Sequence, residues 1–587
     1  MASVIAFVGV HMIALGGIAY TAWAAGNLAS ASIRRDGASV PWGLTVAIGL
    51  ALLAQALLLL GVVGWLRAPV IVVLVLAILA AARRRWMWPT RQSRSISAMA
   101  MAAIALLMLP AFILALYPPL GFDQTMYHLP YARAFAATGG LPFLPSLRYP
   151  TFPALAEVLN AGVLLFADDV ATQLTGVCAL AACAALVFSW TRERSSADGG
   201  RLAAAILAAS PLAIYLSAAG YVEPLLALFG TASLYAADRA GRDGRHAGWI
   251  VASGALAGSA AGVKYLGLYF VAAAALLLLR TNVAWRSIAR DLVLYGLAAA
   301  SALLPSYGRL VAQTGNPLFP FYPELFGATP WMAQEFLGAR GAQRLLNAST
   351  LLWDVTFRRH AVGILPPFSP ALLLGVPLAL IAAWQDAWVL RLLLVATGYV
   401  LVAPVQAHYF LAIAPVWSVV IGVSAASLAS RVRGGRLLLL GVALALVIGG
   451  ELYALGRVHR LGLPPVAMAD RERWVAAERP LYPALAFVNR LAGPAIVYAV
   501  GAEHMVYYAA GTLLGDHNGP ASFNRVAARA QAAGSLASAL DDLHVSYLIL
   551  PVAPSAWTDM AVNDPRLARV YRDAAASVYQ VLPEEAP

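Results

Sequence analysis

The chain has 587 residues, of which 61% are hydrophobic and 12% charged, with a formal net charge of +12. Soluble globular domains carry about 25% charged residues, so this composition excludes a soluble fold for most of the chain. The arginines lie in short clusters between apolar segments, a pattern typical of membrane-topology signals, and no nucleic-acid partner is expected. Cys178 and Cys183 fall in one apolar segment but not on one helical face, so neither a disulfide nor a metal site is expected from them.

About fourteen apolar segments are long enough to predict membrane helices, since about 20 residues cross the hydrocarbon core. The first has no basic residues before it and Arg34 and Arg35 after it, which favours a retained helix over a cleaved signal peptide. The predicted segments are 4–25, 44–65, 69–83, 98–117, 170–190, 202–217, 222–238, 248–263, 265–280, 290–311, 369–384, 388–404, 408–428 and 436–455.

The distribution of arginine predicts the orientation, because short cytoplasmic loops hold the basic residues. With the N-terminus outside, the inner loops are the basic loop at 33–37, five further basic segments and a short turn at 385–388. Two long loops, 118–169 and 312–368, and the turns at Glu223, Lys264 and His408 then lie on the outer side. The basic segments are 83–95, 191–201, 238–248, 280–291 and 430–436.

The composition becomes that of a soluble domain from about residue 456. The stretches 493–500, 545–551 and 576–582 predict strands, and 535–543 and 564–574 predict helices. The sequence therefore predicts a small α/β domain, 456–587, on the outer side. Its glycines do not form a phosphate-binding fingerprint.

The first long outer loop carries the most informative polar residues. Its start, GFDQTMYHLPYARAF, places Asp123, Tyr127 and Arg133 at helical or near-helical spacing. The apolar residues between them predict an amphipathic helix on the membrane surface, with a lipid-facing stripe of Met126, Leu129, Ala132 and Phe135. A carboxylate in this position can accept a proton or bind a cation, but it can equally cap the surface helix.

This loop resembles the first outer loop of the GT-C superfamily. The pattern Asp-x-x-x-Tyr-His-Leu-Pro, followed by Tyr-Pro-x-x-Pro, is similar to bacterial family-39, RgtA/B/C/D-like glycosyltransferases, which are relatives of protein mannosyltransferases and of the lipid A aminoarabinose transferase. Segments 210–229, 254–268, 314–321 and 408–422 resemble later parts of the same family in the same order.

The resemblance implies an enzyme that transfers a sugar from a polyprenyl-phosphate donor, usually with inversion, and it makes Asp123 the general base. The departing phosphate needs positive charge. The candidates are Arg148, Lys264, Arg358 and Arg359. Lys264 is the sole lysine beside thirty-nine arginines, and it acts either as a phosphate contact or as a residue that snorkels at a helix end.

Other polar residues of the loops have two interpretations each. Glu223 contributes to the site or pairs with Lys264. His128 binds a substrate or is only hydrogen-bonded. The further candidates for substrate binding are Gln124, Tyr127, His408 and Tyr409.

Two of these residues depart from the family pattern. Gln124 stands where many relatives have a second acid, which argues against a paired-carboxylate metal site. His408 stands before Tyr409 where relatives have arginine, which weakens phosphate recognition at that position. No cofactor and no metal site are predicted, although a divalent metal ion is left open.

The sequence therefore predicts a mainly α polytopic membrane protein of the GT-C type in a bacterial inner membrane, with its site on the periplasmic side. The predicted units are 1–97 (additional N-terminal helices), 98–455 (catalytic membrane domain) and 456–587 (outer α/β domain). The expected partners are a polyprenyl-phosphate sugar donor, membrane lipids, and a glycan, lipid or protein acceptor. A transporter or flippase of lipid-linked glycans and a non-catalytic scaffold of envelope assembly are the alternatives.

Overall fold

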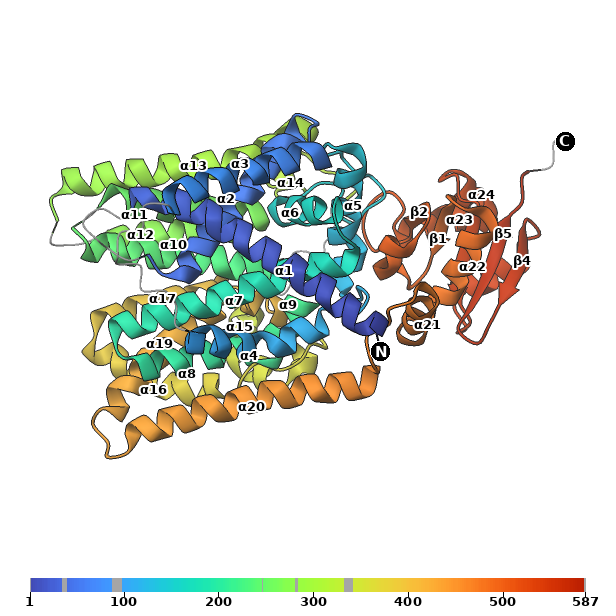
Figure 1. Ribbon diagram of the computed structural model, residues 1–587. Helices are drawn as coiled ribbons and strands as arrows, with labels where there is room; N and C mark the ends of the chain where they lie inside the picture. The colour runs from blue at the N-terminus through green and yellow to red at the C-terminus, as the bar shows by residue number, and fades with distance from the viewer. Residues whose placement is uncertain are drawn as a thin grey trace.

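The computed structural model describes residues 2–33, 40–86, 98–244, 246–279, 283–331 and 341–584. Most of the predicted basic loops at 33–37 and 83–95, and part of the one at 280–291, lie outside these ranges. Within them, a bundle of long helices carries a separate sheet domain at one end (Figure 1). The N-terminus lies at the same end of the bundle as the sheet domain (Figure 1).

Every predicted apolar segment contains a helix. The first half of the bundle comprises α1 (Ala2–Ala29), α2 (Trp42–Val62), α3 (Ala68–Trp86), α4 (Ala98–Leu114), α5 (Leu129–Thr138), α6 (Leu155–Leu164), α7 (Asp169–Arg194), α8 (Ala197–Ala208) and α9 (Pro211–Ala218). The second half comprises α10 (Glu223–Arg242), α11 (Ala247–Val263), α12 (Gly267–Leu278), α13 (Trp285–Thr314), α14 (Pro323–Phe326), α15 (Gly341–Phe357), α16 (Ala371–Gln385), α17 (Ala387–Val402), α18 (Ala407–Phe410), α19 (Ala414–Ala429) and α20 (Gly435–Leu461).

Among the described residues, five helices are long and apolar enough to span a membrane, or six if a bent pair counts as one span. The bent pair is α8 and α9, which meet at 58° at Ser210–Pro211, because a proline disfavours helical backbone in the residue before it. The other apolar helices have 10–17 residues. The predicted number of fourteen spans is therefore not confirmed.

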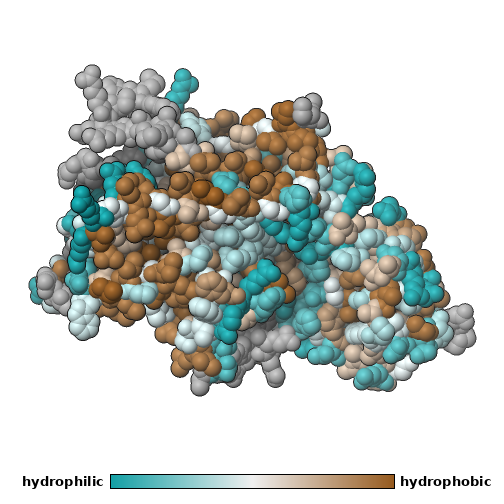
Figure 2. Space-filling view, turned by 90° about the horizontal axis from the view of Figure 1, so that it is seen from below, coloured by the Kyte–Doolittle hydropathy of each residue, from teal (hydrophilic) through white to brown (hydrophobic). Residues whose placement is uncertain are grey.

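Apolar side chains cover the outside of the bundle, as expected where lipid is the solvent. Exposed residues include Leu297 and Leu304 of α13, Leu374 of α16, and Leu437 and Leu452 of α20. Figure 2 shows this apolar surface over the bundle and more polar residues over the sheet domain. The chain is therefore a multi-pass membrane protein.

Small residues let neighbouring helices pack backbone to backbone. Gly254 and Gly258 of α11 form a Gly-x-x-x-Gly pair, and a Cβ on either would lie 2.3 Å from a carbonyl oxygen of α13. Gly26 of α1 and Gly49 of α2 face each other in the same way, at 1.7 and 1.6 Å from the opposite backbone. Close packing of this kind drives helix association where no hydrophobic force acts between helices. It joins the N-terminal helices to the rest of the bundle, because α2 also packs on α6 and α7.

We expect Gly49→Leu to destabilise the bundle by about 1–3 kcal/mol, the usual cost of overpacking. The leucine side chain would collide with the backbone of Ala22 in α1. The matched control is Gly17→Leu, since a Cβ on Gly17 meets nothing within 4 Å. Thermal unfolding in detergent would measure both variants, and equal unfolding midpoints would contradict the close contact.

The C-terminal unit is an α/β domain with a five-stranded sheet in the order β2-β1-β3-β5-β4. Strands β1 (Ile496–Ala499), β2 (Thr512–Leu514) and β3 (Tyr547–Pro551) are parallel, and β5 (Ala576–Val581) runs antiparallel to β3. Helices α21 (Met468–Glu478), α22 (Tyr482–Ala492), α23 (Phe523–Ala533), α24 (Leu536–Asp541) and α25 (Ala556–Asn563) complete the domain.

One predicted element of this domain is wrong. The stretch 564–574 was expected to be a helix, but it forms strand β4 (Leu567–Arg572), which pairs antiparallel with β5 through a bulge between Arg569 and Tyr571. Pairing with β5 satisfies the backbone hydrogen-bonding groups along one side of β4. This long-range contact outweighs the local helical pattern. The three expected strands are confirmed as β1, β3 and β5, and the other expected helix is confirmed as α24.

Candidate functional site

The first outer loop packs inside the protein instead of lying on the membrane. After Asp123 the chain makes a π-helical turn, Gln124–His128, and continues into α5. The expected lipid-facing stripe is buried, because Met126, Leu129, Ala132 and Phe135 are each at most 1% exposed. The prediction of a surface helix is therefore wrong: α5 packs on α6, and the turn packs on residues 503–508 of the C-terminal domain. These partners come from distant parts of the chain.

Asp123 does not cap a helix. It has helical backbone angles and makes no side-chain capping hydrogen bond, and its Oδ2 accepts a hydrogen bond of 2.7 Å from the hydroxyl of Tyr127. The side chain is half-buried. Burial alone would raise the pKa of this carboxyl group, but nearby His408, Lys264 and His128 and the Tyr127 hydrogen bond lower it below its ordinary value. Asp123 is therefore ionised at neutral pH.

Lys264 and Glu223 form a buried ion pair beside Asp123. Lys264 follows the last residue of α11 and Glu223 is the first of α10, and Nζ donates to Glu223 Oε1 at 2.7 Å. The two side chains are 7% and 0% exposed. The ammonium also lies 4.6 Å from the ring centre of Tyr409. The predicted pairing is thus present, and it holds a lysine charge within the electrostatic reach of Asp123.

His408 and Tyr409 complete this cluster from α18. The ring of His408 lies 6.1 Å from that of Tyr221, centre to centre, and its Nε2 is buried without a hydrogen-bond partner among the described residues. His408 lies within electrostatic reach of both Asp123 and Glu223. Residues far apart in the sequence therefore meet around one carboxylate.

Arg148 connects this cluster to the C-terminal domain. Its Nε lies 3.7 Å from Asp516 Oδ1, in the loop after β2, and its guanidinium lies within electrostatic reach of Asp123. The side-chain oxygen of Asn518, in the orientation that satisfies its neighbours, accepts from the same Nε at 3.1 Å. Burial raises the pKa of Asp516, and Arg148 opposes this effect. The loop after β2 therefore belongs to the surroundings of the site.

Two of the predicted substrate-binding residues, Gln124 and Arg358, have other contacts, and Arg359 is exposed. Gln124 is buried, accepts from the backbone N–H of Gly121 and donates to Gln173, so its amide joins the turn to α7. Arg358 and Arg359 are exposed beyond α15, and Arg358 pairs with Asp354 at 2.7 Å. No contact between either arginine and the Asp123 cluster is recorded among the described residues.

Sequence reasoning missed Glu157. This residue lies in the first turn of α6, is 1% exposed, and its Oε1 lies 2.5 Å from Nδ1 of His128. The only signal in the sequence was an acidic residue within an apolar stretch, which membrane proteins hold only at a cost. Asp516 and Tyr221 were missed as well, because neither lies in a recognisable pattern.

Among the described ranges, no group of three or more His, Cys, Asp and Glu side chains has the geometry to hold a metal ion. The combination considered from sequence was Asp123, His128 and Glu223. In the structure Asp123 accepts from Tyr127, His128 contacts Glu157, and Glu223 accepts from Lys264.

The C-terminal domain is docked directly on the turn that carries Asp123. The hydroxyl of Thr125 donates to the backbone oxygen of His504 at 2.5 Å, and the ring of Phe122 stacks on that of His504 at 5.7 Å between centres. Arg133 donates to the backbone oxygen of Tyr507 at 2.8 Å, and Arg471 pairs with Asp169 at the start of α7. The domain therefore covers one side of the site.

We expect acidification to weaken this docking through His504. Burial, aided by Arg479, lowers the pKa of His504 to about 4, whereas an unfolded histidine titrates near 6.5. The contribution of this pKa shift to the free energy of unfolding is fully present above pH 6.5. It declines as the pH falls toward 4, because only the unfolded state then takes up the proton. At pH 5 the free energy of unfolding is lower by about 2 kcal/mol.

The measurement is the difference in thermal unfolding midpoint between pH 7 and pH 5. His504→Gln removes the titrating group and should reduce this difference, while His544→Gln, in a surface turn of the same domain, serves as the control. An unchanged pH dependence in His504→Gln would contradict the assignment.

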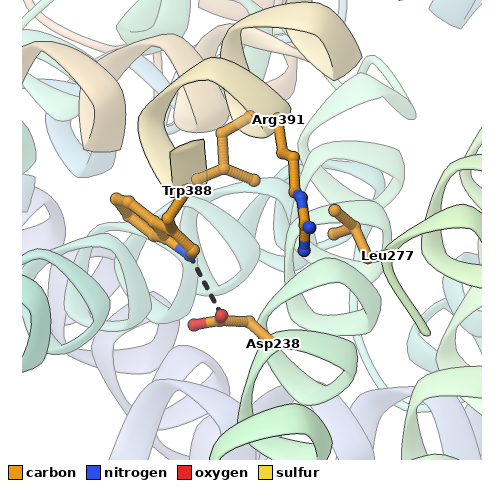
Figure 3. Close-up of a pocket in the computed structure, with 5 residues that line it drawn as sticks. Asp238, Leu277, Trp388 and Arg391 are labelled. Atoms are coloured by element: carbon orange, nitrogen blue, oxygen red, sulfur yellow. Dashed lines mark hydrogen bonds between the residues drawn. The ribbon is translucent and has the colours of Figure 1, made fainter. Parts of the chain in front are cut away.

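A small pocket lies at the other end of the bundle, some fifteen residues along α10 from Glu223, or about 22 Å at the helical rise. Asp238, Leu277, Trp388, Arg391 and Leu392 line it. Figure 3 shows the indole N–H of Trp388 donating to Asp238, at 3.0 Å, with Arg391 opposite. Because Asp238 also pairs with Arg194, we interpret it as an anchor for the arginine-rich helix ends.

Comparisons with known proteins agree with this architecture. A family model described as dolichyl-phosphate-mannose-protein mannosyltransferase matches residues 152–307, and one described as SF2091/S2213 matches residues 470–580. An uncharacterised protein of Shigella flexneri is 32% identical over 117 residues, which are 20% of this chain and 58% of that protein. The chain thus spans little more than half the length of this curated relative.

Solved structures extend the likeness to most of the chain. The crystal structure of ArnT from Cupriavidus metallidurans bound to undecaprenyl phosphate matches with a TM-score of 0.53 and 15% identity, over 83% of this chain and 99% of that one. The apo form of ArnT matches with a TM-score of 0.52. The expected resemblance is confirmed: the chain is a multi-pass membrane protein with the GT-C fold and a small C-terminal sheet domain.

Proposed function

We propose that the protein is a membrane glycosyltransferase that moves a sugar from a polyprenyl-phosphate donor to an acceptor hydroxyl, with Asp123 as general base. The observation that carries this proposal is the state of Asp123. Its carboxylate is ionised and half-buried, is free of any capping role, and lies beside the buried cation Lys264. The undecaprenyl phosphate in the ArnT crystal structure supports the choice of donor.

The proposed reaction is a single displacement. Asp123 accepts the proton of the acceptor hydroxyl as its oxygen attacks the anomeric carbon. The bond from that carbon to the phosphate oxygen breaks, the configuration inverts, and polyprenyl phosphate leaves with the bonding electrons. Tyr127, which donates to Oδ2, fixes the orientation of the carboxylate.

Positive charge for the leaving phosphate is proposed to come from Lys264 and Arg148. An ammonium has three N–H donors, and Lys264 directs one of them to Glu223, so two others remain for phosphate oxygens. The Nε of Arg148 faces Asp516, and its Nη1 meets only the weak acceptor Sδ of Met126. Glu223, His128, His408 and Tyr409 then surround the sugar. Arg358 and Arg359, the other two predicted phosphate contacts, lie at an exposed segment and stay predictions.

The site is proposed to face the periplasm of a bacterial inner membrane. Helix α10 begins at Glu223 in the site and ends at Arg239 and Arg242, and α7 ends with Arg192 and Arg194. These arginine-rich helix ends lie opposite the site. The positive-inside rule favours a cytoplasmic location for them, which leaves the site on the other side of the membrane. The acceptor is proposed to be an envelope glycan, lipid or protein.

The test uses the full-length protein in nanodiscs with a radiolabelled polyprenyl-phosphate hexose or pentose and an extract of envelope acceptors. We expect release of polyprenyl phosphate together with labelled product. Movement of the labelled lipid across liposomes without any product would favour a flippase. Neither product nor movement, with intact donor binding, would favour a scaffold.

A further inference from the structure

The buried pair of His128 and Glu157 takes no part in the proton transfer to Asp123 described above. The two side chains are 2% and 1% exposed and are joined through His128 Nδ1 and Glu157 Oε1 at 2.5 Å. His128 directly follows Tyr127 in the π-helical turn, and Glu157 lies in α6. Local π-helical turns often occur at functional sites. The pair therefore adjoins Tyr127, the residue that donates to Asp123.

A third element, α13, brings a cation within electrostatic reach of Glu157. Arg309 of α13 is 8% exposed, donates to the backbone oxygen of Phe152 and interacts electrostatically with Glu157. A carboxylate only accepts hydrogen bonds, so Nδ1 of His128 carries a proton in this contact. In the neutral ring, Nε2 then carries the lone pair.

The contact with Glu157 involves only Nδ1 of the imidazole ring. Nε2 of His128 is shielded from solvent and has no hydrogen-bond partner among the described residues. A buried polar atom without a partner costs about 1–3 kcal/mol, so its presence needs a reason. The ring lies within electrostatic reach of both Asp123 and His408. Nε2 is thus a polar atom without a partner in the surroundings of the site.

We propose that Glu157 is a positioning residue that holds His128 so that Nε2 accepts a hydrogen bond from a sugar hydroxyl in the transfer site. The inference rests on the proposed glycosyltransferase function and names a chemical group that this site recognises. A nitrogen with a lone pair cannot donate to a phosphate oxygen, which excludes the lipid phosphate as its partner. The hydroxyl belongs either to the donor sugar or to a sugar acceptor.

Two near-isosteric substitutions of His128 distinguish the roles of its two ring nitrogens, Nδ1 and Nε2. His128→Asn places an amide near the position of Nδ1 and keeps the contact with Glu157, but removes the acceptor at Nε2. His128→Gln reaches the position of Nε2 and gives up the contact with Glu157. We expect His128→Asn to lower kcat/KM about tenfold, the worth of one hydrogen bond, and His128→Gln to retain more activity. The opposite order would overturn the proposal and leave the pair as a structural contact.

The role of Glu157 is tested by a double-mutant cycle. Glu157→Gln should lower kcat/KM in the wild-type background, because the amide can present its donor to Nδ1 and change the tautomer. It should have little further effect in the His128→Gln background, where Nδ1 is absent. Equal effects in both backgrounds would show that Glu157 acts on stability alone, and thermal unfolding of all four proteins checks their folding.

Kinetics and binding identify the source of the hydroxyl. A rise confined to the KM for the donor in His128→Asn assigns it to the donor sugar, and a rise confined to the KM for the acceptor assigns it to the acceptor. Binding of a polyprenyl phosphate without sugar should be unchanged, and a loss of that binding would overturn the hydroxyl assignment. All values are ratios to wild-type transfer, so absence of transfer by the wild type would refute the proposed function instead.

Discussion

Asp123→Asn is expected to lower the rate of sugar transfer by about 10²–10⁴-fold, the usual contribution of a positioned general base. The amide has almost the shape of the carboxylate, and its oxygen still accepts the hydrogen bond from Tyr127, so the turn should keep its structure. What is lost is the ability to take a proton from the acceptor hydroxyl. Single-turnover measurement of polyprenyl phosphate release would isolate this step from product dissociation.

The expected pattern is a loss in kcat with little change in donor binding. Asp559→Asn is the control, because Asp559 is exposed on α25 of the C-terminal domain. Tyr127→Phe should have a smaller effect than Asp123→Asn, since it removes only the orienting hydrogen bond. Normal transfer by Asp123→Asn would remove the general-base assignment.

Lys264→Met should cause the largest loss of stability among single substitutions in the site. It would leave Glu223, which is fully buried, without its cation, and breaking a buried pair in this way costs about 3–5 kcal/mol. Transfer activity should also fall, because the leaving phosphate loses its nearest ammonium. Thermal unfolding in detergent and the transfer assay measure the two effects separately.

A double substitution separates stability from chemistry. Lys264→Met combined with Glu223→Gln removes both charges and should regain most of the lost stability, while transfer stays low. Arg473→Met is the matched control, because it breaks a pair with Asp470 in which both side chains are exposed, and such pairs contribute about 0–1 kcal/mol. Recovery of transfer in the double variant would exclude Lys264 from donor binding.

The structure changes the interpretation of the polar residues more than that of the helices. Periodic apolar segments are local signals, so every predicted segment contains a helix, and the change of composition near residue 456 correctly predicts the sheet domain. Local signals were insufficient at 564–574, where pairing with β5 decided the conformation. They were also insufficient for α5, whose apolar face meets protein instead of lipid.

The sequence by itself determined that this is a membrane protein with the GT-C resemblance, and it singled out Asp123, Lys264 and Glu223. It could do so because apolar length, arginine clusters and short motifs act within one segment of the chain. Only the tertiary structure decided which residues of different segments meet: Lys264 with Glu223, and His128 with the unforeseen Glu157. These contacts join residues up to forty-one positions apart, and they depend on how helices pack, which no local pattern of residues encodes.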